Sequence, residues 1–238
     1  MEIDIPSDTV IVILTPHSVR ESILNFFMSK NFSVICEKPL FWTKNQMKKF
    51  NALHEKWPNV MYHRSFNKLI PTIKKFVTHN YHDIEEIEIV YCEDITLHTS
   101  GDEYQTTIDS DGGGCINDNF PNCMNLLMTV VGSEVELINV NSKHIKDITT
   151  QSEIELKVNG LKCVVKLDWH SKNDEKSVLI KTKNSNIYYH LQHDYNPFKS
   201  SLYHEYRNIF TTLDLDDQES KKNTIVITEM LDLINSHS

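Results

Sequence analysis

Residues 8–40 read DTVIVILTPHSVRESILNFFMSKNFSVICEKPL and contain two apolar runs separated by a helical pattern. Residues 9–14 are an unbroken apolar and β-branched run, which predicts a parallel strand covered on both faces. A helix is expected next, opened by a capping box of Ser18 and Glu21. Residues 32–36 then form a second apolar strand. The stretch is therefore a predicted β-α-β unit.

Each of the two predicted strands ends in a short motif. Thr15-Pro16 follows the first strand, and Glu37-Lys38-Pro39 follows the second. In open parallel sheets, ligands bind at the carboxyl ends of the strands, so we expect the two motifs to lie side by side at a ligand site. A lysine in this position is either a solvated strand end or a positioned acid–base group.

A second motif lies at residues 111–122, which read DGGGCINDNFPN. The glycines at 112–114 lack the preceding strand and the following Lys-Ser/Thr of a phosphate-binding loop. We interpret them as allowing a close backbone approach. Asp118 is near the start of a helix predicted over residues 118–131, where the helix dipole favours a negative charge. Asn122 is one turn further and faces the same way.

In this order, the two motifs resemble the glucose–fructose oxidoreductase / inositol 2-dehydrogenase (Gfo/Idh/MocA) family, from about Asp8 to the end of the chain. The resemblance implies an NAD(P)-dependent oxidoreductase that transfers a hydride at a carbinol carbon of a sugar, polyol or sugar nucleotide. Lys38, Asp118 and Asn122 are the catalytic residues it implies, and Asp118 and Asn122 also contact the substrate. The family usually has His or Tyr at the position of Asn122 as proton acceptor, a role that asparagine cannot fill near neutral pH.

The resemblance also assigns binding residues. It implies that the cofactor is held at the two strand ends, by Thr15, Pro16, Arg20, Glu37, Lys38 and Pro39. Arg20 is suited to a phosphate or carboxylate, with a solvated helix residue as the alternative. Arg64 matches an arginine common in the family and is expected to bind substrate, the alternative being a surface residue. Tyr104, in a polar loop, is a further candidate substrate-binding residue and proton donor.

The glycine-rich loop that holds the cofactor pyrophosphate in this family is missing from the sequence. The six glycines are at 101, 112, 113, 114, 132 and 160, so no G-x-G-x-x-G precedes residue 101. We therefore expect a truncated Rossmann-like domain, as a fragment, a split subunit or a shortened relative. A separate chain could supply the loop. The competing hypothesis is a non-catalytic (pseudoenzyme) dimerising or sugar-binding relative that has lost it.

The rest of the chain completes an α/β plus α+β fold with two domains. Residues 1–80 form a partial Rossmann-like nucleotide-binding domain, with a helix capped by Thr43 and Gln46, a strand over 60–63, and a helix over 67–78 with Pro71 in its first turn. Residues 81–238 form an open antiparallel-sheet domain for substrate binding and dimerisation, whose final helices pack back on the first domain.

The predicted elements of this second domain are strands over 84–98, 135–140, 154–158, 161–169, 177–182 and 187–191, and helices over 200–213 and 225–234. Asn159-Gly160 is a hairpin turn. Helices should cover one face of the sheet, and the other face is expected to serve self-association into a homo-oligomer.

Composition excludes several other functions. The net charge of −9, with no Lys/Arg run, argues against nucleic-acid binding. The five cysteines include no C-x-x-C, so neither a disulfide framework nor a zinc site is expected. His190 and His193 are more often a solvated pair than metal ligands. The sequence has no signal peptide and no apolar run of spanning length, so we expect a cytoplasmic protein without a membrane partner.

Overall fold

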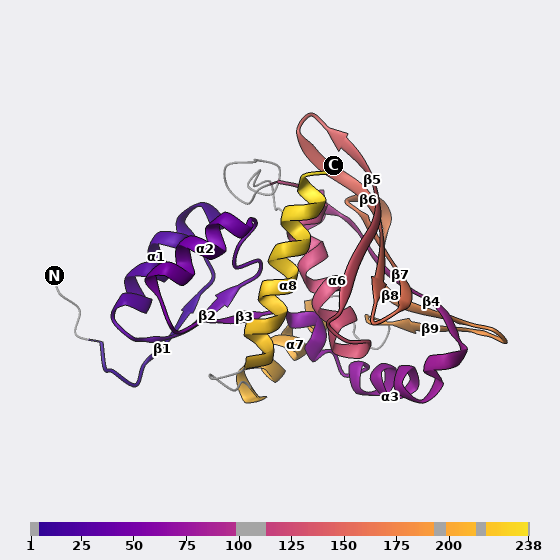
Figure 1. The fold of residues 1–238 in the computed structure, drawn as a ribbon, viewed down its shortest axis with the longest axis horizontal. Helices are drawn as coiled ribbons and strands as arrows, with labels where there is room; N and C mark the ends of the chain where they lie inside the picture. The colour runs from indigo at the N-terminus through magenta and orange to yellow at the C-terminus, as the bar shows by residue number, and fades with distance from the viewer. Residues whose placement is uncertain (1–4, 99–112, 193–198, 213–217, 238) are drawn as a thin grey trace.

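A computed structural model describes residues 5–98, 113–192, 199–212 and 218–237. Its first part is a three-stranded parallel sheet in the order β1-β2-β3. The strands are β1 (Val10–Ile13), β2 (Ser33–Glu37) and β3 (Asn59–Met61). Helices α1 (His17–Ser29) and α2 (Lys44–Leu53) connect them and lie on the same side of the sheet (Figure 1).

The connection to the second part is helical. It consists of η1 (His63–Phe66), α3 (Ile70–Asn80) and η2 (Tyr81–Asp83). The capping box of Thr43 and Gln46 is confirmed at the start of α2, and Pro71 lies in the first turn of α3 as predicted. The capping box of Ser18 and Glu21 is wrong. Pro16 is the N-cap residue of α1, no side chain caps the helix, and Ser18 is already inside it.

The second part is a six-stranded sheet in the order β5-β6-β7-β4-β8-β9. Its strands are β4 (Ile84–Asp94), β5 (Val135–Ile145), β6 (Ile148–Val158), β7 (Leu161–Asp168), β8 (His170–Thr182) and β9 (Asn186–His190). Residues 95–98, expected to continue β4, form the short helix α4 (Ile95–His98) instead. The β6–β7 hairpin is confirmed, with positive φ angles at Asn159 and Gly160.

The sheet is mixed rather than wholly antiparallel. Strands β7 and β8 follow one another in the chain, but β4 lies between them. Since β7 and β8 run in opposite directions, β4 must be parallel to one of them, and it is parallel to β7 and antiparallel to β8. Alternation along a strand identifies its buried face but not the direction of its neighbours, so this pair could not be predicted.

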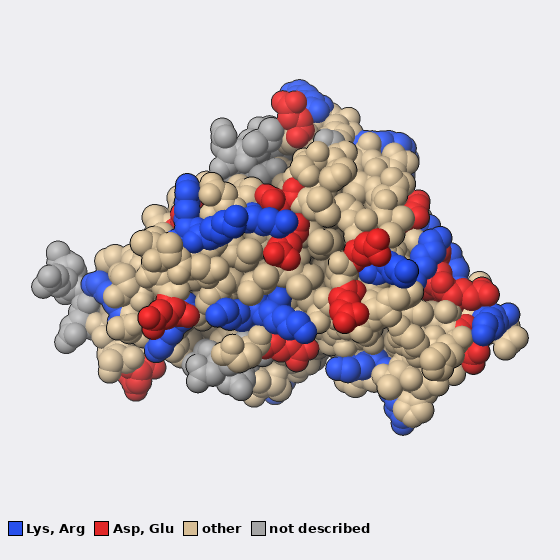
Figure 2. Space-filling view, viewed as in Figure 1, with Lys and Arg blue, Asp and Glu red and all other residues tan. Residues whose placement is uncertain are grey.

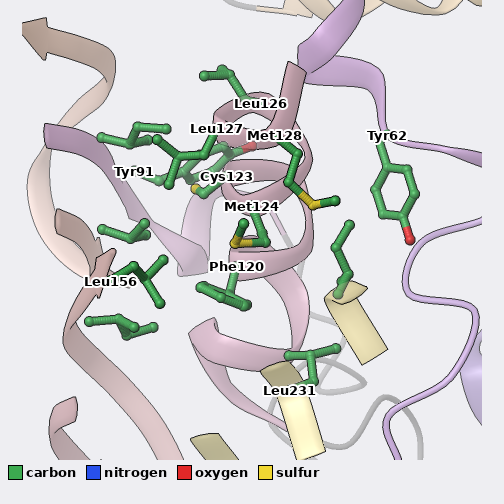
Figure 3. Close-up of a cluster of buried hydrophobic side chains, with 14 of the residues drawn as sticks. Tyr62, Tyr91, Phe120, Cys123, Met124, Leu126, Leu127, Met128, Leu156 and Leu231 are labelled. Atoms are coloured by element: carbon green, nitrogen blue, oxygen red, sulfur yellow. The ribbon is translucent and has the colours of Figure 1, made fainter. Parts of the chain in front are cut away.

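Helix α6 (Gly114–Val130) covers the inner face of this sheet and forms the centre of the core. Figure 3 shows Phe120, Met124 and Leu127 of α6 among Leu156 of β6 and Leu231 of α8 (Gln218–Asn235). Helix α8 lies between the two sheets in Figure 1 and also contacts α2 and β3. The remaining helix is α7 (Lys199–Thr212), which packs on η1.

A glycine fixes the start of α6. A Cβ atom on Gly114, whose φ is +93°, would lie 2.7 Å from the carbonyl oxygen of Thr149 on β6. The expected close backbone approach is therefore confirmed at this glycine, and the helix begins four residues before Asp118.

The outer face of the six-stranded sheet is polar. Ion pairs join neighbouring strands there, with Lys162 Nζ 2.6 Å from Glu86, Lys166 Nζ 3.0 Å from Glu88, and Lys181 Nζ 2.6 Å from Glu86. On the face of the molecule in Figure 2, acidic and basic side chains are likewise interspersed. The uncovered sheet face is therefore not an apolar surface, and self-association through it stays a prediction.

Candidate functional site

A pocket of about 820 Å³ lies where the carboxyl ends of β1 and β2 meet α6, η1 and α7. It therefore lies between the two sheets, at the edge where ligands of parallel sheets bind. The wall is formed by Leu14, Thr15, Pro16, Arg20, Glu37, Lys38, Pro39, His63, Arg64, Tyr91, Glu93, Ile95, Gly114, Asn117, Asp118, Asn119, Asn122, Trp169, Leu202, Tyr206 and Phe210. Every predicted site residue is among them except Tyr104, which lies outside the described residues.

Lys38 and Asp118 form an ion pair across the pocket. Lys38 Nζ donates to a carboxylate oxygen of Asp118 and, at 2.7 Å, to the main-chain carbonyl of the same residue. Residues 80 positions apart are joined because the end of β2 faces the first turns of α6. The Lys38 side chain is mostly buried, whereas that of Asp118 is one-third exposed.

Two carboxylates keep Lys38 charged. Burial alone would lower the pKa of Lys38, but the negative charges of Asp118 and Glu37 outweigh it, so the pKa lies above its ordinary value. The ammonium is therefore the resting form in this pocket. It can donate a proton or a hydrogen bond to a ligand oxygen, and can accept a proton only after its own has left.

Arg20 holds the two strand ends together. Its guanidinium donates to the carbonyl oxygen of Thr15 at 2.8 Å and to that of Pro39 at 2.7 Å, with longer bonds to the carbonyls of Glu37 and Lys38. The side chain is buried, so the alternative of a solvated helix residue is wrong. Arg20 fixes the geometry of both motifs through the backbone.

The sequence did not predict His63, which lies in the pocket wall, or the buried Glu205 that contacts it. His63 Nδ1 lies 2.8 Å from Glu205 Oε2, and His63 Nε2 lies 3.0 Å from Asn122 Nδ2. The His63 ring is also stacked on Tyr206, whose hydroxyl donates to Glu37 at 2.5 Å. All of these contacts join segments far apart in the chain.

Glu205 is held ionised by its neighbours. Burial alone would raise the pKa of Glu205, but the Arg64 guanidinium and His63 lower it below the ordinary range. Arg64 Nη1 donates to both carboxylate oxygens, at 3.1 and 3.2 Å, and Asn67 donates to one of them at 2.7 Å. Arg64 also donates to the hydroxyl of Tyr91 and is fully buried, so it is not the surface residue given as the alternative.

The sequence did carry one signal for Glu205. Ser201, Glu205 and Ile209 recur every fourth residue on α7, and all three are buried. A glutamate on the buried stripe of an amphipathic helix calls for a partner of opposite charge.

Polar atoms without a partner gather in this pocket. Among the described residues, the buried side-chain atoms without a hydrogen-bond partner include Thr15 Oγ1, Asn122 Oδ1 and Trp169 Nε1, all from residues of the pocket wall. A buried unpaired polar group costs about 1–3 kcal/mol, so such atoms are usually satisfied. A ligand with hydroxyl groups could satisfy donors and acceptors alike.

The pocket fits one half of a nicotinamide cofactor better than the other. Thr15, Pro16, Lys38 and Pro39 form its wall at the two strand ends, and the unpaired Thr15 hydroxyl can bond a ligand there. A pyrophosphate needs backbone N–H groups in a glycine-rich turn, and no glycine precedes residue 101. The described residues thus include those that the resemblance implies for the nicotinamide end, but no glycine-rich turn that could cradle a pyrophosphate.

The described residues contain neither a candidate metal site nor a candidate membrane-spanning helix. No group of three or more His, Cys, Asp or Glu side chains among them could hold a metal ion. Within the same residues, no helix combines the length and the apolar character that crossing a bilayer requires.

Comparison with known proteins supports the fold. No protein-family model matches the sequence, and no curated protein matches it. Solved structures do match. Levoglucosan dehydrogenase in complex with NADH and L-sorbose has a TM-score of 0.77 at 15% identity, over 98% of this chain and 78% of that one. The WlbA dehydrogenase from Bordetella pertussis, in complex with NADH and UDP-GlcNAcA, has a TM-score of 0.74 at 13% identity, over 95% and 75%.

An inositol dehydrogenase homologue from Azotobacter vinelandii, complexed with NAD⁺, has a TM-score of 0.70 at 10% identity, over 95% of this chain and 75% of that one. The chain has the fold of these dehydrogenases. The resemblance drawn from Glu37-Lys38-Pro39 and residues 111–122 is thus confirmed for the fold.

Proposed function

We propose that this chain provides the substrate pocket and the nicotinamide-facing wall of an NAD(P)-dependent oxidoreductase acting on a sugar, polyol or sugar nucleotide. The observation that carries the proposal is the ion pair of Lys38 with Asp118, in one pocket with Asn122 at the carboxyl ends of β1 and β2. Hydroxyl-rich ligands suit a wall that offers an ammonium, a carboxylate and an amide.

The residues divide the work by their chemistry. Asp118, one-third exposed, accepts hydrogen bonds from substrate hydroxyls. Lys38 is charged at rest and donates to the oxygen on the reacting carbon. Because reduction of a ketone consumes a proton and oxidation of an alcohol releases one, a protonated Lys38 favours reduction. Thr15 bonds the cofactor at the strand ends. A bound nicotinamide would supply the hydride.

The pyrophosphate cradle would come from a strand, glycine-rich loop and helix that pair with β1. Strand β1 is the edge of its sheet among the described residues, and Val10, Val12 and Leu14 leave apolar surface exposed there. Parallel strands are normally covered on both faces, and an open edge with apolar side chains invites another strand. The solved structures that match are longer, since this chain covers 75–78% of them.

A second candidate function rests on Asn122. It stands where the resemblance expects a proton acceptor, so the chain would bind a sugar without oxidising it. Both candidate functions use the same pocket, but only the oxidoreductase would turn over its substrate.

The test uses the chain as it is and a fusion that adds a strand–glycine-loop–helix segment before Asp8. Both are assayed for NADH and NADPH consumption with a panel of keto-sugars and keto-polyols, and for reduction of NAD⁺ and NADP⁺ with the matching alcohols. The oxidoreductase hypothesis expects turnover by the fusion, lowered by about 10²-fold or more in Lys38→Met. Binding of a sugar by calorimetry with no turnover in any form would favour the sugar-binding candidate instead.

A further inference from the structure

Only one end of the Asn122 side-chain amide has a hydrogen-bond partner among the described residues. It is 1% exposed on α6 and lies in the wall of the pocket. Its Nδ2 atom is 3.0 Å from His63 Nε2, and its Oδ1 atom has no hydrogen-bond partner among the described residues. A buried amide with one paired and one unpaired end has a defined orientation only if its partner fixes it.

His63 fixes that orientation through its own hydrogen bond to Glu205. An ionised carboxylate only accepts hydrogen bonds, so Glu205 requires the hydrogen of the imidazole to be on His63 Nδ1. A neutral imidazole carries one N–H, which leaves Nε2 as an acceptor. Asn122 must then point its amide nitrogen at His63 and its carbonyl oxygen away from it.

We propose that Glu205 and His63 are positioning residues that hold Asn122 with its carbonyl oxygen toward the pocket, so that this wall recognises a ligand hydroxyl as a hydrogen-bond donor. A ketone or carboxylate oxygen has no hydrogen to give and is disfavoured at this point of the wall. The inference deepens the proposed function, because it rests on a hydroxyl-bearing ligand occupying the pocket. It assigns Asn122 a role in recognition in place of proton transfer.

Protonation of His63 would reverse the arrangement. An imidazolium donates from both nitrogens, so Asn122 would have to turn its oxygen to His63 and its NH₂ group to the pocket. The groups that face His63 are Glu205 and Tyr206 from α7, the neighbouring Arg64, and Glu37 from β2. Burial and the Arg64 charge lower the pKa of His63 despite Glu205, so the neutral ring prevails at neutral pH.

The decisive measurement is the tautomer of His63, which requires neither a ligand nor turnover. Nitrogen-15 NMR correlation spectra of protein labelled at its twelve histidines distinguish the Nδ1–H tautomer, the Nε2–H tautomer and the imidazolium. The His63 signal is the one lost in His63→Gln. If that variant does not fold, the signal is the one with through-space contact to the ring of Tyr206. The Nδ1–H tautomer at neutral pH supports the proposal, and the Nε2–H tautomer or an imidazolium overturns it.

The role in recognition is tested with myo-inositol as a neutral polyol probe, its binding to the whole chain measured by saturation-transfer NMR. Asn122→Leu is close in size and has no acceptor, whereas Asn122→Asp keeps an oxygen toward the pocket. We expect Asn122→Leu to weaken binding on the order of tenfold and Asn122→Asp by less than about threefold. Equal binding by Asn122→Leu and the parent overturns the role in recognition. If myo-inositol binds to no form, the polyol part of the proposed function is weakened, while the tautomer still decides whether Asn122 is positioned.

Discussion

The two sheets of this chain are covered to different extents. The inner face of the six-stranded sheet packs on α6 and excludes solvent, with Ile89 of β4 only 1% exposed. The three-stranded sheet is closed on the side of β3, where α8 packs, and open at β1, where Val12 is 40% exposed. Ile89 and Val12 are both apolar, β-branched residues, so the type of side chain does not explain the difference. What differs is whether another element covers the strand.

The proposed enzyme can be described as two halves, a cofactor half built on the three-stranded sheet and a substrate half built on the six-stranded sheet. On the proposed substrate side of the pocket, hydrogen bonds among Glu205, His63 and Asn122 join η1, α6 and α7. The cofactor side has its strand ends in place, held by Arg20, but ends at β1. The pocket lies on the boundary between the two.

The largest expected effect concerns Lys38, the residue that joins both halves. Lys38→Met keeps the length of the side chain and removes its charge, its bond to Asp118 and the proton it would donate. In the fusion that carries the glycine-rich loop, turnover should fall by about 10²-fold or more, the usual size of a general acid–base contribution, with a much smaller change in substrate affinity. Steady-state kinetics of the fusion and its variant measure both quantities. A loss of only a few-fold would make Lys38 a binding residue.

A matched pair of core substitutions tests the contrast between the sheets directly. Ile89→Ala opens a cavity beneath α6 and should lower the free energy of unfolding by about 2–5 kcal/mol. Val12→Ala removes side-chain atoms that solvent already reaches and should cost less than about 1 kcal/mol. Urea unfolding monitored by circular dichroism gives both values. If Val12→Ala proved as costly as Ile89→Ala, β1 would be covered in solution, and the open edge would be an interface between chains.

Elements that depend on neighbouring residues were predicted well from the sequence. Residues 9–14 and 32–36 predicted β1 and β2 because continuous apolar, β-branched runs of this length are typical of parallel strands. The capping box of Thr43 and Gln46 and the Asn159-Gly160 turn depend on neighbouring residues only, so they too were predictable. The prediction that the first strand is covered on both faces was wrong, because the burial of a strand depends on elements elsewhere in the chain.

The candidate site likewise contains residues that could be predicted from the sequence and residues that could not. Lys38 and Asp118 were predicted through a resemblance that fixed their positions, and the structure brings them together. His63 and Glu205 could not be paired from sequence, since 142 positions separate them and no local pattern links η1 to α7. A buried glutamate can be suspected from the helical repeat, but its partner follows only from the tertiary structure.

Acid should lower the stability of the three-stranded sheet and its helices through His17, a buried residue of α1 stacked on Trp42. Burial, helped by the Arg20 charge, lowers the pKa of His17 from 6.5 to about 4. The unfolded chain therefore binds a proton more readily between these values, and stability is lost as the pH falls from 6.5 toward 4, by up to about 3 kcal/mol.

Urea unfolding at a series of pH values measures this loss, and His17→Gln, which keeps an N–H for the carbonyl of Leu40, should reduce the slope across the same interval. An unchanged slope in the variant would assign the acid sensitivity to carboxylates.

The smallest expected effect is that of NADH on the chain itself. Without a glycine before residue 101, the pyrophosphate meets no backbone cradle, and β1 presents an edge where that cradle would be anchored. If the dissociation constant is about 1 mM or weaker, NADH at about 0.1 mM stabilises the fold by no more than about 0.1 kcal/mol, which thermal unfolding does not resolve. A dissociation constant of about 1 μM would stabilise it by about 2.7 kcal/mol at the same concentration. The fusion with a strand–glycine-loop–helix segment should move the chain from the first behaviour to the second. Tight binding by the unmodified chain would mean that Thr15 and its neighbours hold the cofactor without a cradle, and β1 would no longer need a partner strand to explain its exposed edge.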